Sequence, residues 1–209
     1  MALAAAIGSA AGASVLASAL PASPDGAFTD AWASGGSYFY GQTIAAQFTL
    51  AFDSTIDGFT VWGSSENFLF PGLNNVAGVE VVIWNSDFSL QVLGAVIAGG
   101  DLSIAATGNA NSNGGIEYRI GGDLAGFLAA GTYHLNVGAI LLDPDGDAFS
   151  WSTSVGSGFS ANFFDGLGWA AFDDLDVPAF ELLGSVVPAP GALALFGALG
   201  AVPARRRRR

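Results

Sequence analysis

The chain has 209 residues, enough for one domain of ordinary size together with processing segments. Hydrophobic residues make up 51% of it and charged residues only 11%, less than half the roughly 25% of a usual soluble domain. The absence of cysteine excludes disulfides and any cysteine-based metal site or nucleophile. The formal net charge is −12, yet apart from a terminal run of five arginines the chain sets 18 acids against Arg119 alone. One cation outside that run cannot neutralise a row of phosphates, so a nucleic-acid binder is excluded.

The first 22 residues carry no charge and are predominantly Ala, Leu, Ile, Val, Gly and Ser. A secretory signal peptide needs an apolar stretch of roughly 7–15 residues followed by small residues at the cut. We therefore predict a signal peptide over 1–22, cut after Ala17-Ser18-Ala19 or after Leu20-Pro21-Ala22. The usual basic start is missing, which is expected if the true start codon lies upstream. The alternative is an Ala-rich tail or a first helix.

Residues 23–185 alternate apolar and polar side chains in short runs separated by turn residues, a pattern typical of strands. The clearest run puts five apolar side chains on one face: Ile44, Ala46, Phe48, Leu50 and Phe52. Eight further strands are predicted at 56–63, 77–84, 88–97, 102–107, 115–120, 132–140, 148–153 and 178–184. Turns are predicted at Asp57-Gly58, Asn74-Asn75, Gly99-Gly100-Asp101, Asn113-Gly114-Gly115 and Asp143-Pro144-Asp145-Gly146. This spacing predicts a single all-β domain, an antiparallel β-sandwich or jelly roll.

One segment of this body has a different pattern. The sequence DLAGFLAA at 123–130 predicts a short helical turn before the strand that follows. No segment of helical period alternates with the strands, so a parallel sheet with crossover helices is not expected.

The C-terminal segment, 186–209, has three parts in a fixed order. Pro188, Ala189 and Pro190 form a Pro-x-Pro motif, 14 uncharged residues follow at 191–204, and the chain ends in Arg205, Arg206, Arg207, Arg208 and Arg209. Fourteen residues make about 21 Å of helix, whereas the hydrocarbon core of a bilayer is about 30 Å thick. We therefore expect a short transmembrane helix at 191–204. An arginine block after such a helix is a stop-transfer pattern that leaves the arginines in the cytoplasm.

This order resembles the PEP-CTERM sorting signal, with Ala189 in place of the motif's usual Glu. The resemblance implies export from a Gram-negative bacterium and transient retention in the inner membrane. It also implies processing near the motif by an exosortase, a membrane transpeptidase with a Cys-His-Arg site. The body is similar to an uncharacterised exported sandwich found in that family, in the segments 46–50, 55–63, 83–87, 131–135, 149–151 and 179–184.

Catalytic constellations are scarce. His134 is the only histidine, and strand alternation places it with Asn136 on the face opposite Tyr133, Leu135 and Val137. It is interpreted as a surface or inter-sheet histidine. Glu117 and Arg119 share the polar face of one strand and are interpreted as a surface ion pair. We therefore expect no enzyme activity.

Two sets of residues suggest ligands. Asp143, Asp145 and Asp147 place three carboxylates at alternate positions of a turn, as a calcium loop does, although the same residues are also those of an ordinary solvated turn. Four aromatic residues are candidates for stacking on sugars: Trp32, Tyr38, Tyr40 and Trp84. Trp151 is expected in the core, as most sandwich tryptophans are.

The sequence thus predicts an exported protein, anchored by its C-terminal helix before processing and then at the cell surface or outside the cell. Its expected role is structural or adhesive, in the surface or extracellular polymer layer. The alternative is a lectin-like module, assisted by Ca²⁺, that binds exopolysaccharide.

Overall fold

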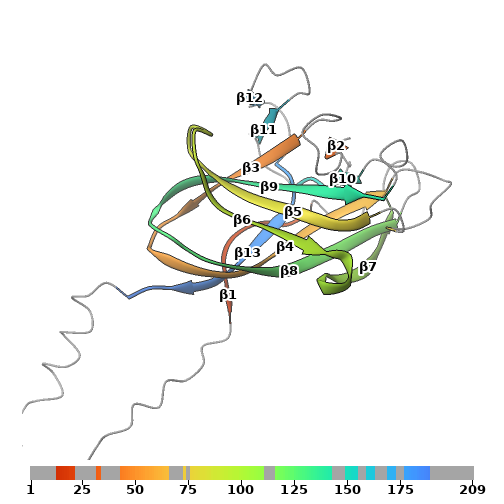
Figure 1. The fold of residues 1–209 in the computed structure, drawn as a ribbon, viewed down its shortest axis with the longest axis horizontal. Helices are drawn as coiled ribbons and strands as arrows, with labels where there is room; N and C mark the ends of the chain where they lie inside the picture. Colours follow the sequence, from red (N-terminus) through yellow and green to blue (C-terminus); the bar gives the residue numbers. More distant parts are fainter. Residues whose placement is uncertain are drawn as a thin grey trace, which may run out of the picture.

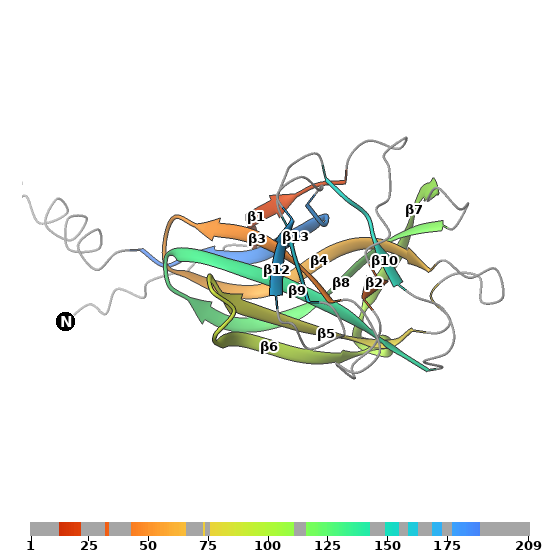
Figure 2. The ribbon, with the colours of Figure 1, turned by 90° about the horizontal axis from the view of Figure 1, so that it is seen from above.

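The computed structural model describes residues 13–21, 32–33, 43–65, 73, 76–110, 116–142, 149–154, 159–162, 169–172 and 177–188. This part of the chain is all-β, with two antiparallel sheets that face each other (Figures 1 and 2). Its one helical element is the 3-10 turn η1 (Gly99–Asp101). The predicted all-β class is therefore confirmed, in a β-sandwich-like arrangement.

The first sheet is built around the long strand β4 (Ser54–Ser65). On one side β4 pairs with β8 (Ile116–Leu128), which pairs in turn with β7 (Ser103–Ala110). On its other side β4 pairs with β13 (Phe180–Val186) and, further along, with β10 (Phe149–Trp151). The outer strands beside these two are β1 (Ser14–Ala19) and β2 (Trp32–Ala33).

The second sheet has six strands in the spatial order β12-β11-β3-β9-β5-β6. Their bounds are β12 (Trp169–Phe172), β11 (Phe159–Asn162), β3 (Thr43–Leu50), β9 (Gly131–Leu141), β5 (Val76–Asn85) and β6 (Gln91–Ala98). All five pairings are antiparallel; β5–β6 and β11–β12 join strands that are consecutive in the chain, and the other three join strands that are distant in it.

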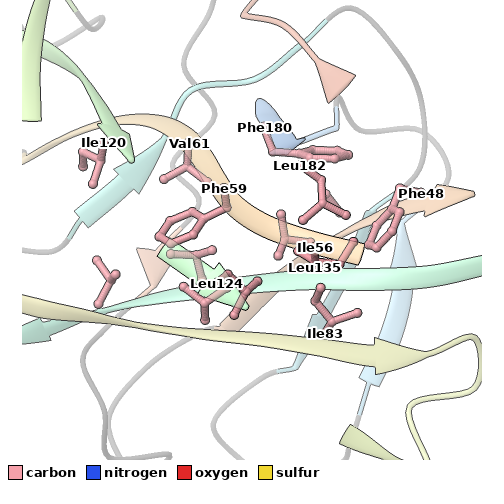
Figure 3. Close-up of a cluster of buried hydrophobic side chains, with 14 of the residues drawn as sticks. Phe48, Ile56, Phe59, Val61, Ile83, Ile120, Leu124, Leu135, Phe180 and Leu182 are labelled. Atoms are coloured by element: carbon pink, nitrogen blue, oxygen red, sulfur yellow. The ribbon is translucent and has the colours of Figure 1, made fainter. Parts of the chain in front are cut away.

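The core lies between the two sheets, because alternate residues of both point inward. Figure 3 shows the inward-facing side chains meeting in the middle, among them Phe59, Leu124 and Leu182 from the first sheet and Phe48, Ile83 and Leu135 from the second. The predicted face of β3 is confirmed for Ile44, Ala46, Phe48 and Leu50, and Trp151 is buried as expected.

The structure corrects three local predictions. Residues 123–130 do not form a helical turn, because the segment to Leu128 continues β8 and pairs with β4. Asp57-Gly58 is not a turn between strands but lies inside β4, at a shift in the register with β8. Phe52 lies beyond the end of β3 and is 64% exposed, so it does not belong to the core face.

Four strands lie outside the nine predicted ones: β1, β2, β11 and β12. β1 occupies 14–19, within the segment predicted as a signal peptide, and β13 extends the last strand to Val186. The predicted C-terminal helix at 191–204 lies outside the described residues. In the part that is described, no helix has the length and apolar character needed to cross a membrane.

Candidate functional site

The described surface has an open groove of about 390 Å³ on the first sheet. Glycines make room for it, since Gly58 of β4 and Gly121 of β8 lie where larger residues would fill the space. Gly58 sits at the register shift of β4, and a Cβ there would lie 2.9 Å from the backbone oxygen of Gly122. Gly58 therefore permits the close approach of β4 and β8, and its lack of a side chain leaves space for the groove.

Polar and charged groups are prominent among the residues that line the groove. Asp57, Asp101 and Asp123 contribute exposed carboxylates, and Thr60 and Ser103 contribute hydroxyls. They come from β4, η1, β8 and β7, which the pairing of β8 with both β4 and β7 brings together. Carboxylates and hydroxyls in an open groove can accept and donate hydrogen bonds to a polyol.

Arg119 is the one cation among the described residues that line the groove, and several neighbours hold it. Its Nη2 lies 3.2 Å from Thr60 Oγ1 and 3.5 Å from Glu181 Oε2, and its guanidinium lies over the ring of Trp62, 5.8 Å from the centroid. Trp62 and Arg119 are direct partners across β4 and β8, so they share the outer face. Arg119 thus covers Trp62 while its side chain remains about half exposed.

Glu117 corrects the predicted surface pair with Arg119. The two share a face as expected, but Glu117 is only 2% exposed and its carboxylate accepts hydrogen bonds from Thr107, Asn109 and Ser152. Thr107 Oγ1 lies 2.7 Å and Asn109 Nδ2 3.0 Å from Glu117 Oε1, while the Ser152 hydroxyl bonds the second oxygen. Arg119 instead pairs with Glu181 of β13. The buried carboxylate joins β7, β8 and the residue after β10.

His134 lies on the outer face of the second sheet together with Asn136, as the alternation predicts, but it is buried there at 6% exposure. The ring of Phe88 stacks on it with centroids 4.0 Å apart. Its Nε2 donates to the backbone oxygen of Ser86 at 3.2 Å. Burial lowers the pKa of His134 below 6.5, and the hydrogen bond to Ser86 offsets part of that effect. The geometry therefore suits a neutral imidazole.

Phe88 reaches His134 by an uncommon backbone conformation. Its φ is 59°, in the left-handed region that bulky side chains rarely adopt. The turn between β5 and β6 holds it there: the amide of Phe88 donates to Asn85 O, and Asp87 Oδ1 accepts from the amide and the hydroxyl of Ser89. The hydrogen bonds from the hydroxyl and the amide of Ser89 lower the pKa of Asp87.

The predicted ligand residues are placed as follows. Trp84 of β5 is half-buried, opposite His134, and its ring lies 6.5 Å from that of Phe88. Trp32 belongs to β2, although its side chain is not described. Tyr38, Tyr40, Asp143, Asp145 and Asp147 lie outside the described residues, as do Ala189, Pro190 and the arginine run. Across the described residues there is no group of three or more His, Asp or Glu side chains that could hold a metal ion.

The groove residues are ones that sequence reasoning missed. Asp57 and Asp101 were assigned to turns and Asp123 to a helical turn, so none was expected to share a surface. The available signal was the spacing Arg119-x-Gly121-x-Asp123, which on a strand places all three on one face.

Comparisons with known proteins add no family to these observations. A scan against protein-family models finds no match to the chain, and a search of curated proteins finds no relative. The groove, the hydrogen bonds around Glu117 (the Glu117 cluster) and the stacking of Phe88 on His134 (the His134 stack) are therefore interpreted from the structure of this chain alone.

Proposed function

We propose that the chain is an exported surface protein, processed through its C-terminal sorting signal, with a structural or adhesive role. The observation that carries this proposal is the order of the C-terminal segment, Pro-x-Pro, apolar stretch and arginine run. Export and membrane retention follow from an apolar segment that ends in positive charge. The processing partner is an exosortase-type enzyme, which the resemblance to PEP-CTERM signals implies.

The end of the fold supports a cut at this motif. β13 ends at Val186, and the last backbone hydrogen bond described runs from the amide of Val187 to Asp53 O at 2.7 Å. Pro188 follows and is exposed. A cut near Pro188 and Pro190 would therefore remove the apolar segment and the arginines without removing a described strand.

The net negative charge of the body supports an extracellular role in which the protein contacts polymer or cations. Once the arginine run is removed, Arg119 is the only cation among up to 18 acids. High net charge keeps a domain soluble and sets which partners it attracts. An acidic sandwich of this kind suits a component of the surface or extracellular polymer layer.

The proposal is tested by measuring the intact mass of the exported protein by mass spectrometry. The protein is expressed in a Gram-negative host with an exosortase and in a matched host without it. We expect the first host to yield a chain cut near Pro188–Pro190 and the second to retain the uncut chain. Replacing both Pro188 and Pro190 by Ala should block the cut, whereas Pro203→Ala, outside the motif, should leave it unchanged. A single mature form ending in the five arginines, in the presence of the exosortase, would contradict the proposal.

The groove supports a second candidate, carbohydrate binding. Its carboxylates, hydroxyls and guanidinium are groups that hydrogen-bond sugar hydroxyls, and it is open to solvent. A glycan array with and without chelator tests this idea and the calcium dependence together. Asp123→Asn should reduce any binding by about tenfold, the loss of one good hydrogen bond to a charged group. Glu80→Gln, on the other sheet, is the matched control. No binding in either condition would refute this candidate.

A further inference from the structure

β1 is part of the folded sheet. Its register with β13 runs from Ser14 opposite Gly184 to Ala19 opposite Phe180. The hydroxyl of Ser14 donates to Gly184 O at 3.1 Å. Leu16, Ala17 and Ala19 pack against the hydrophobic core. Figure 2 shows β1 alongside β13, and β1 is the outermost strand on this side of the sheet. The strand therefore contributes both backbone pairing and apolar contact.

A signal cut after Ala19 or Ala22 would remove this strand entirely. β13 pairs with β4 on one side and with β1 on the other, so without β1 the segment 180–184 would become an open sheet edge. The open edge would then move from β1 to β13, and the apolar contacts of Leu16, Ala17 and Ala19 with the core would be lost. The cut after Ala22 would also remove the bridge between Pro21 and Ser154, whereas the cut after Ala19 would leave Pro21 as the second residue of the mature chain.

A third cut site, Ala11-Gly12-Ala13, avoids this loss. Small residues at the first and third positions before the bond are the features that signal peptidase requires. Ten residues of almost entirely apolar sequence precede the motif, within the length of a signal core. Ala13 is exposed, and β1 begins at the very next residue.

We propose that signal peptidase cuts the exported chain between Ala13 and Ser14, so that Ser14 becomes the mature N-terminus and β1 stays in the sheet. This site rests on the proposed export through a signal peptide. Hydrolysis of the bond adds one water and leaves a carboxylate on Ala13, which departs with the leader, and an ammonium group on Ser14.

The groove provides an electrostatic reason for this N-terminus. Ala13 lines the groove together with Asp57, Asp101 and Asp123, and Ser14 follows Ala13 directly in the chain. The new ammonium would place a positive charge near carboxylates in a body whose only other cation is Arg119. Opposite charges attract, so the carboxylates of the groove favour an ammonium group at this end of β1.

The test is N-terminal sequencing of the full chain exported from a Gram-negative host. We expect the mature form to begin at Ser14. Ala13→Phe, which puts a large side chain at the cut, should accumulate as uncleaved precursor, whereas Ala22→Phe should be processed as the parent is. In the exported protein, amide hydrogen exchange should show protected amides within 14–19.

The outcomes separate this site from the proposed function. An exported chain that begins at Leu20 or Ser23 would overturn the cut after Ala13 and leave export standing. Unprotected amides throughout 14–19 would also overturn it, because β1 would then not be a strand of the mature domain. A chain that stays unprocessed inside the cell would overturn export and, with it, this cut.

Discussion

Replacing Glu117 by alanine tests whether the buried carboxylate holds β7, β8 and β10 together. Thr107 and Asn109 lie at or near the surface, so water can replace their lost acceptor at little cost. Ser152 is only 1% exposed, and its hydroxyl would be left without its carboxylate partner. An orphaned buried donor costs about 1–3 kcal/mol, and the lost hydrogen bonds to a charged group add to this. We expect Glu117→Ala to lower the free energy of unfolding by about 2–4 kcal/mol.

Urea unfolding followed by tryptophan fluorescence measures this loss. The double variant Glu117→Ala/Ser152→Ala removes the orphan together with its partner, and it should be more stable than Glu117→Ala alone by about 1–2 kcal/mol. Glu181→Ala is the control, because its contact with Arg119 is long and partly exposed and is worth at most about 1 kcal/mol. A Glu117→Ala protein as stable as the parent, or a double variant no more stable than the single one, would refute the reasoning.

Three further predictions follow from the backbone and the His134 stack. Gly184→Ala should destabilise by about 1–3 kcal/mol, because the new Cβ would overlap the backbone oxygen of Thr55, whereas Gly138→Ala, with open space around it, should cost almost nothing. At position 88, the glycine variant should be about 1 kcal/mol more stable than the alanine variant, since only alanine keeps the strain of φ 59°. Stability should fall as pH drops below 6.5, because unfolding then lets His134 take up a proton, and His134→Gln should lose that part of the dependence.

Thermal or urea unfolding of matched variants measures all three. Equal midpoints for the two glycine positions would show that β13 can move away from β4 at no cost. An alanine variant at position 88 that exceeds the glycine variant would mean that the turn adopts another conformation in solution. For His134 the sign follows from the lowered pKa: its contribution is complete above 6.5 and is lost on the acid side. Identical pH profiles for parent and His134→Gln would refute it.

The alternation of apolar residues was enough to predict the fold class and most strand faces. Along β3 and β9, buried apolar residues such as Ile44, Phe48 and Leu135 occur at alternate positions because one face of each strand is buried. The turn signal failed at Asp57-Gly58, because Asp-Gly is typical of a turn and also of a register shift inside a long strand. Helical propensity in 123–130 was outweighed by pairing with β4, a tertiary effect that local sequence does not contain.

The groove and the Glu117 cluster depend on which strands become neighbours. Asp101 and Asp123 meet on one surface only because β7 and β8 pair, and Ser152 reaches Glu117 only because β10 continues the line of β13 along β4. Strand order of this kind arises from long-range contacts, so spacing along the chain cannot supply it. For His134, alternation predicted the correct face of the strand, and only its burial under Phe88 could not be predicted from the sequence.

The position of Arg119 has a practical consequence for detecting this protein. With no lysine in the chain, the bond after Arg119 is the one tryptic site before the arginine run, and it lies in the middle of β8, paired on both sides. Trypsin should therefore cut the body only when the sheet opens, so a single cleavage reports global unfolding in an all-or-none manner. The two fragments are too long for routine peptide mass spectrometry, so surveys based on trypsin will tend to overlook the protein. A protease that cuts at acidic residues would reveal it.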